Sequence, residues 1–226
     1  MQAIKKNNTH GHKIPKDILN NTLMVNDIGL QKIKTKRIYK DFMKKENIEP
    51  NKLRCEKYVP LNQVDTAHTI YIKCYANITD THTRAFQYKF LNNILINNYW
   101  LTKWKIKNDT NCTFCGIMEE NMLHLFWQCQ YVKSFWDEFQ LWVNQFKRYN
   151  LSEYSIFYGE DDCLLCTLIL TAKKTIYYNR HKNNKPNFQH FKHLIRLIRK
   201  KELNTAINDG RMVSYAEKWE PLSIFE

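Results

Sequence analysis

The sequence lacks both a long hydrophobic run and an apolar N-terminal segment. The longest apolar stretch, from Cys163 to Ala172, is too short to span a bilayer. The first eight residues, MQAIKKNN, contain no signal segment. The seven cysteines are an odd number, which does not favour a framework of paired disulfides. We therefore expect an intracellular, soluble protein with no membrane partner.

A complete polymerase metal motif is also lacking. Residues 158–162, YGEDD, resemble the Tyr-x-Asp-Asp hairpin whose aspartates bind two Mg2+ ions, but their spacing is one residue too long. No β-rich pattern flanks them, and no upstream metal-binding aspartate with its own motif is apparent. An acidic helix start at Asp161 and Asp162 is the simpler interpretation. We therefore expect no catalytic residues in this chain.

Aromatic residues and positive charge are abundant. The 226 residues are 43% hydrophobic and include six Trp, thirteen Tyr and twelve Phe, enough for the core of one large domain or two small ones. A total of 35 basic against 22 acidic residues gives a net charge of +13 and a pI near 9.3. Such a balance predicts a polyanionic partner, with RNA or DNA as the first candidate. The alternative is a basic protein whose charge serves solubility alone.

The most informative motif is C-x2-C-x8-H-x4-C, formed by Cys112, Cys115, His124 and Cys129. Three thiolates and one imidazole satisfy the tetrahedral preference of Zn2+ and leave no open position for chemistry, so they predict one structural zinc ion. Gly116 can take the positive φ that a tight Cys-x2-Cys turn requires. The alternative is a set of buried free cysteines with a packed histidine.

The second half of the motif predicts a short helix that carries His124. Glu119 and Glu120 suit a helix N-terminus, and an apolar face follows them. Residues five apart on an ideal α-helix differ by roughly 140° around its axis, so His124 and Cys129 could not share one face. We therefore expect the helix to end or unwind near Gln128. Cys163 and Cys166 have no glycine, histidine or turn beside them, so we interpret both as core residues and not as metal ligands.

The fold class expected is mainly α: a helical domain with a small zinc-knuckle loop and possibly one short strand or hairpin. The divisions predicted are an N-terminal connecting segment with a basic helix (1–50), a zinc-binding domain (51–150) and a C-terminal basic helical tail (151–226). The basic helix starts near Ile33 and ends before Pro50. Residues 70–75 alternate in a way that permits a short strand, although a helical start is also compatible.

Apolar periodicity predicts further helices from Thr81, over residues 131–146 and 164–178, and after Pro186. The aromatic stripe of residues 131–146 is more typical of a packed core than of a base-stacking platform. Gly159 is expected to end one of these helices and separate it from the next.

Two groups of basic residues are the predicted nucleic-acid contacts. Lys103, Lys105 and Lys107 would share one side if their segment were extended. The alternative is that they are solvated lysines around Trp104 and Ile106 as core anchors. The second group lies on the polar face of the last helix and consists of Lys192, Arg196, Arg199 and Lys200, with Lys201 beside them. This face could also be merely solvated.

Five motifs follow one another between residues 84 and 142. They are FQYKFL at 86–91, the polar stretch 97–107, CTFCG at 112–116, the Glu-x3-His-Leu-Phe-x2-Cys pattern from Glu120 to Cys129, and FW at 135–136. In this order they resemble the zinc-binding region at the C-terminal end of non-LTR (LINE-type) retrotransposon reverse transcriptases. Asn121 departs from the family, which often has Ser or Thr there, but no ligand is affected.

The resemblance implies a zinc-stabilised module that binds RNA or DNA and assists target-primed reverse transcription, while the polymerase lies upstream. It also implies an intracellular ribonucleoprotein in the nucleus, the cytoplasm or both, with other domains of a retrotransposon polyprotein as possible partners. Two alternatives remain. One is a protein-interaction scaffold of a retrotransposon-derived protein, and the other is a residual Mg-dependent polymerase or nuclease that uses Asp161 and Asp162.

Overall fold

The computed structural model describes residues 24–25, 28–29, 52–76, 78 and 80–223. The chain divides into two compact units, residues 1–50 and residues 51–226. In the first unit, strands β1 (Met24–Val25) and β2 (Ile28–Gly29) pair antiparallel, with Val25 opposite Ile28. The basic helix predicted before Pro50 lies outside the described residues.

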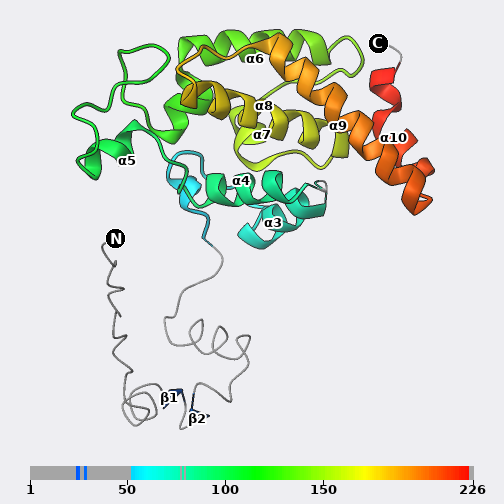
Figure 1. The fold of residues 1–226 in the computed structure, drawn as a ribbon, viewed down its shortest axis with the longest axis horizontal. Coiled ribbons are helices and arrows are strands. Elements are labelled where there is room, and N and C mark those ends of the chain that lie inside the picture. The colour runs from blue at the N-terminus through cyan, green and yellow to red at the C-terminus, as the bar shows by residue number, and fades with distance from the viewer. Residues whose placement is uncertain (1–23, 26–27, 30–51, 77, 79, 224–226) are drawn as a thin grey trace, which may run out of the picture. The chain divides into compact units, whose positions relative to one another are not determined.

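The second unit is helical (Figure 1). Its elements are η2 (Arg54–Lys57), α3 (Ala67–Ala76), α4 (Thr81–Leu91), α5 (Asn98–Lys103), η3 (His124–Gln128), α6 (Gln130–Val143), α7 (Glu153–Tyr158), α8 (Cys163–His181), α9 (Phe188–Asp209) and α10 (Met212–Ser223). The mainly α fold class is therefore confirmed.

Polar side chains at the helix ends explain where these helices begin. The carboxylate of Asp80 accepts a hydrogen bond from the Thr83 amide at the start of α4, and Asp162 accepts one from Leu165 at the start of α8. Such caps satisfy amides that have no partner inside the helix. Gly159 ends α7 at a φ of +81°, so the predicted interruption between two helices is confirmed.

Helix α8 supplies the centre of the core and packs against α4, α7, α9 and α10 (Figure 1). Most of its residues are buried, which fits the prediction of a buried helix over 164–178. The aromatic stripe of α6 packs on α9 through edge-on ring contacts, with the ring centres of Phe135 and Phe191 5.9 Å apart. The stripe therefore forms core, as its periodicity indicated.

Residues 70–75 lie in helix α3, so the helical alternative of the two that their pattern allowed is confirmed; Ile70 is fully buried in this helix, which packs against α4. The interpretation of both Cys163 and Cys166 as core residues was wrong for one of them. Cys163 is exposed, since it occupies the first turn of α8, where its side chain faces solvent; Cys166, one turn later, is fully buried. Helix α10 was not predicted.

None of the helices in the described part of the chain combines the length and apolar content needed to cross a membrane.

Candidate metal centre

The first half of the metal motif is a small hairpin. The Glu120 amide donates to the Thr110 carbonyl at 2.7 Å, and the Cys112 amide donates to the Met118 carbonyl at 2.8 Å. An isolated antiparallel bridge joins Asn111 to Glu119 between them. These bonds hold the Cys-x2-Cys turn at the tip of a closed loop.

Gly116 closes the turn with a φ of +69°, and its amide donates to the Cys112 carbonyl at 2.8 Å. A Cβ atom added at Gly116 would meet nothing within 4 Å. Glycine is therefore needed for its backbone conformation and not for space.

The second half of the motif contains a π-helical turn. In η3 the Cys129 amide donates to the carbonyl of His124, five residues earlier, at 2.9 Å. Cys129 itself is extended, with φ −60° and ψ 130°. The helix therefore ends at Gln128, as expected. The π turn adds a residue to the helical repeat and so brings His124 and Cys129 to the same side, which an α-helix would not do.

Asn121 provides the cap for this turn. Its side-chain oxygen accepts a hydrogen bond from the His124 amide at 2.9 Å. The amide oxygen of Asn121 thus provides the cap that a Ser or Thr hydroxyl would provide in the pattern of the family.

The four predicted ligands converge. Their ligand atoms all lie within 4.8 Å of one another, with 3.9 Å between the sulfurs of Cys112 and Cys129 and 3.4 Å between Cys115 Sγ and His124 Nε2. With Zn–S and Zn–N bonds of about 2.3 and 2.05 Å, a regular tetrahedron places two sulfurs ~3.8 Å apart and a sulfur and a nitrogen ~3.6 Å apart. The arrangement therefore has the size of a tetrahedral zinc site.

The same distances exclude a disulfide, whose sulfurs would be about 2.05 Å apart. Among the residues that the structure describes, these four form the one group of three or more His, Cys, Asp or Glu side chains placed to share an ion.

The donors are shielded from water. Cys112, His124 and Cys129 are buried, and Cys115 is half-buried. The hydrogen bond to Cys129, followed by burial, raises the pKa of Cys112 to about 12, and the same hydrogen bond lowers the pKa of Cys129. A metal ion would replace the proton that these two sulfurs share, because it binds thiolates and not thiols.

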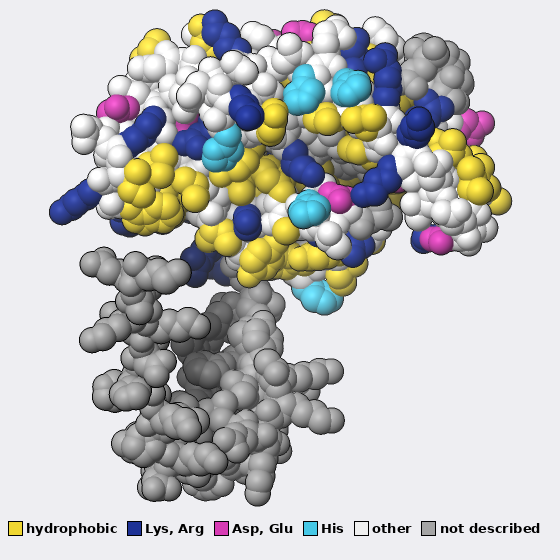
Figure 2. Space-filling model, in the orientation of Figure 1, with side chains coloured by type: hydrophobic (Ala, Val, Ile, Leu, Met, Phe, Trp, Pro, Cys, Tyr) yellow, Lys and Arg dark blue, Asp and Glu magenta, His cyan; other side chains and the backbone are white. Residues whose placement is uncertain are grey.

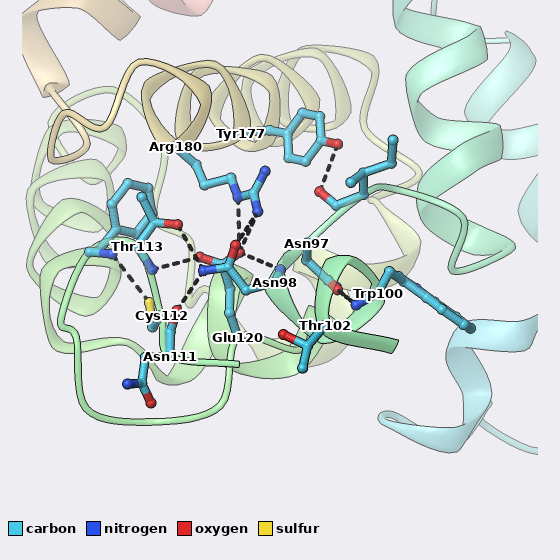
Figure 3. A network of polar contacts seen from close by, with 12 residues as sticks. Asn97, Asn98, Trp100, Thr102, Asn111, Cys112, Thr113, Glu120, Tyr177 and Arg180 are labelled. Atoms are coloured by element: carbon cyan, nitrogen blue, oxygen red, sulfur yellow. Dashed lines mark hydrogen bonds and ion pairs between the residues drawn. The ribbon is translucent and has the colours of Figure 1, made fainter. Parts of the chain in front are cut away.

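The sequence did not reveal the role of Glu120, which lies at the centre of a buried polar network (Figure 3). Its fully buried carboxylate accepts hydrogen bonds from the amides of Asn98 (2.8 Å) and Thr113 (2.7 Å) and from Nε of Arg180 (2.9 Å). The Arg180 guanidinium also donates to the Asn98 side-chain oxygen at 2.8 Å.

This network joins three separate elements. Asn98 begins α5, Thr113 lies between the two cysteines of the hairpin, and Arg180 is near the end of α8. The hairpin is thereby attached to the helical core by a buried ion pair and by hydrogen bonds, in addition to the cluster of cysteines and histidine. The Glu in the Glu-x3-His pattern was the one sequence signal for this network, and nothing in the sequence paired it with Arg180.

The first predicted basic group, Lys103, Lys105 and Lys107, does not lie on an extended segment. Helix α5 continues to Lys103, and Lys105 has a φ of +59°, so the segment is not extended and the condition under which the three lysines would share one side is not met. All three are exposed. Trp104 and Ile106 are 51% and 68% exposed, so they do not anchor the core as the alternative had them.

The second basic group lies on α9. Arg196 and Lys200 are exposed, while Lys192 and Arg199 are half-buried. Figure 2 shows Lys and Arg side chains spread over the helical unit, with few acidic ones on the same face.

The acidic residues before α8 are committed to structural contacts. Asp162 caps the helix and pairs with Lys147, Asp161 pairs with Lys73 at 3.0 Å, and Glu160 accepts from the Tyr149 hydroxyl at 2.8 Å. They lie between two helices and not in a β-hairpin. The helix-start interpretation of Asp162 is therefore confirmed.

A mainly helical unit that brings three cysteines and one histidine together at tetrahedral spacing has the architecture of a zinc-stabilised domain. Residues 34–136 match the family described as zinc-binding in reverse transcriptase. The match covers the zinc-binding region and not the polymerase catalytic domain. No curated protein and no solved structure matches the chain. The family and the donor set both indicate zinc.

Proposed function

We propose that this protein is a zinc-stabilised nucleic-acid-binding module that binds RNA or DNA and assists target-primed reverse transcription in a LINE-type element. The observation that carries the proposal is the buried Cys3His cluster inside a segment that matches reverse-transcriptase zinc-binding regions. The net charge of +13 supports a polyanionic partner.

Zinc has a folding role in this proposal. Cys112, Cys115, His124 and Cys129 would hold it, and four protein ligands leave no position for water or substrate. Two of these ligands, Cys112 and Cys129, belong to the same core cluster as Phe126 and Phe135. Loss of the ion would therefore disturb the core that supports the whole helical unit.

Nucleic acid would be bound mainly through its phosphates. The basic residues predicted for this role are at the surface, whether exposed or half-buried, at the end of α5, on the segment after it and on α9. Flexible lysine and arginine side chains contact phosphate oxygens with little base specificity. We infer that the module positions template or target strands and that catalysis belongs to another part of the polyprotein. The proposal places it in a ribonucleoprotein of the nucleus or cytoplasm.

The test begins with the metal content of the purified full chain, compared with Cys115→Ser. Cys163→Ser is the matched control, because Cys163 is an exposed cysteine outside the cluster. We expect about one zinc ion in the wild type and the control. The Cys115→Ser variant should lose the zinc together with its helical circular-dichroism signal.

The same samples are then titrated with single-stranded RNA over a range of salt concentrations. If about six phosphates are neutralised, the log–log slope of affinity against salt should be about −4. A zinc-dependent fold without measurable RNA or DNA affinity would refute nucleic-acid binding and favour the interaction scaffold. Absence of stoichiometric metal would refute the zinc module itself.

A further inference from the structure

A groove unconnected with the metal ligands opens beside α5. Its volume is about 610 Å³, which lies within the range of about 300–1,000 Å³ typical of small-molecule sites. Its main lining residues come from η2 with the residues before it and from α5 with its C-cap, and they are Lys52, Leu53, Arg54, Lys57, Trp100 and Trp104.

Two stacked indole rings form one wall of the groove. The rings of Trp100 and Trp104 lie 6.0 Å apart between centres, with an angle of 25° between their planes. Trp104 is 51% exposed, so a large part of its ring has no packing partner in the described part of the chain. In Figure 2 hydrophobic side chains gather over the α5 region. An exposed aromatic ring at a groove is a surface on which a ligand ring can stack.

Positive charge surrounds these rings. Lys52, Arg54 and Lys57 are all exposed at the groove, and Nζ of Lys103 lies 5.2 Å from the centre of the Trp100 ring. None of these four forms an ion pair with a carboxylate in the residues that the structure describes. The adjacent Glu56 carboxylate is engaged, because it accepts the Leu53 amide at 2.6 Å.

Two buried polar atoms of the groove-lining residues lack a partner in the part of the chain that the structure describes. Asn93 Oδ1 and Trp100 Nε1 are buried and have no hydrogen-bond partner among the described residues. Buried polar groups are nearly always paired, so an acceptor and a donor left over at one groove need an explanation.

We propose that this groove binds an unpaired nucleotide of a single-stranded nucleic acid. The base stacks on Trp104, and Lys52, Arg54 and Lys57 contact the flanking phosphates. Stacking on an aromatic ring within a basic groove is the general mode of single-strand binding, and it needs a base whose face is free. A duplex, whose base faces are covered by neighbouring pairs, would reach the basic rim alone. This inference rests on the proposed function and assigns it a site.

The test measures binding of the full chain to a labelled ten-nucleotide oligouridine and to an RNA duplex of equal length. Trp104→Ala should weaken single-strand binding about 5- to 150-fold and leave duplex binding within about twofold. Trp104→Phe should retain most of the affinity, because a phenyl ring still stacks. Arg54→Gln should reduce the steepness of the salt dependence by about 0.7 for single strands.

Tyr75→Ala is the matched control. Tyr75 is also an exposed aromatic residue beside an arginine, at 40% exposure and with Arg84 5.7 Å from its ring. It lies near the N-terminal end of α4, whereas Asn93 in the groove follows the C-terminal end. Its loss should leave single-strand affinity unchanged. Melting temperatures of all variants should stay near the wild-type value, because both replaced rings face solvent.

Ultraviolet crosslinking of the wild-type protein to oligouridine gives a second readout that does not depend on a variant's folding. Peptide mapping should find the crosslink within residues 98–104. A map confined to α9, or equal affinity of wild type and Trp104→Ala, would overturn the groove assignment and leave the proposed function standing. If the wild-type chain binds neither the oligouridine nor the RNA duplex, both the groove assignment and the proposed function are refuted. If a protein segment fills the groove instead, no crosslink will map to residues 98–104, and the groove assignment is overturned.

Discussion

Replacement of Glu120 by glutamine tests whether the buried network holds the zinc hairpin to the helical core. Glutamine has almost the shape of glutamate but offers one acceptor oxygen and an NH2 group in place of two acceptor oxygens. Glu120 receives donors at both of its oxygens, from Asn98 and Arg180 at Oε1 and from Thr113 at Oε2. In either orientation of the glutamine, its NH2 group must face another donor.

The cost follows from burial. Glu120 is fully buried and Arg180 is 6% exposed, so the substitution leaves the guanidinium charge without a counter-charge and without water. Removing one partner of a buried ion pair costs about 3–5 kcal/mol. For a unit of 150–250 residues each kcal/mol shifts the melting temperature by about 2–4 °C, so we expect a decrease of about 6–20 °C. This loss is a large share of the ~5–15 kcal/mol that stabilises a typical domain.

The assays are urea unfolding with saturating zinc and zinc affinity by competition with a chromophoric chelator. Thr113 lies between Cys112 and Cys115, and its amide is held by Glu120 at 2.7 Å. Loss of an outer partner that orients metal ligands typically weakens metal binding about 10- to 100-fold, and we expect this range for Glu120→Gln.

Glu119→Gln is the matched control, since Glu119 is the exposed neighbour of the same residue type. Its stability should stay within about 0.5 kcal/mol of the wild type. If Glu120→Gln unfolds at the wild-type urea concentration and binds zinc as tightly, or if both variants lose equal stability, the network does not have the role assigned to it.

Three further predictions concern the Asp80 cap at low pH, the Asn121 cap and the glycine of the Cys-x2-Cys turn. Burial raises the pKa of Asp80, but the hydrogen bonds from Thr83 and the charges of Lys174 and Lys201 together outweigh it and lower this pKa to about 2, so the stabilisation by Asp80 is complete above its unfolded pKa near 4. That stabilisation should be lost as the pH falls from about 4 to 2, and acid unfolding of Asp80→Ala should lack this component. Asn121→Ala should cost about 0.5–2 kcal/mol in urea unfolding, while Asn121→Ser should retain the cap on His124. Gly116→Ala should cost about 1–2 kcal/mol from its left-handed backbone, with no steric clash.

The metal ligands were predictable from the sequence because a zinc site is encoded by residue type and short-range spacing. Cys112, Cys115, His124 and Cys129 lie within 18 residues, so local chain geometry brings them together. Helix positions were predictable for a similar reason. Apolar periodicity and capping residues such as Asp162 act over a few residues, and the helices starting at Thr81 and Cys163 follow from them.

The sequence left a choice open where a local pattern was ambiguous, and a prediction failed where the surroundings decided. Ile70 fits one face of either a strand or a helix, and packing against α4 selects the helix. Trp104 looks like a core anchor by composition, yet α5 ends beside it and leaves its ring at the surface. The way in which His124 and Cys129 meet also required the structure, because a π turn is rare and has no reliable sequence pattern.

The sequence by itself determined the cluster of three cysteines and one histidine, the helical class and the excess of positive charge, because each depends on residue type and near neighbours. Tertiary structure alone decided that Glu120 meets Arg180, 60 residues away, and that Arg54 lies at the same groove as Trp104. Contacts between residues distant in the chain depend on how the helices pack, and packing depends on the summed shape of many buried side chains.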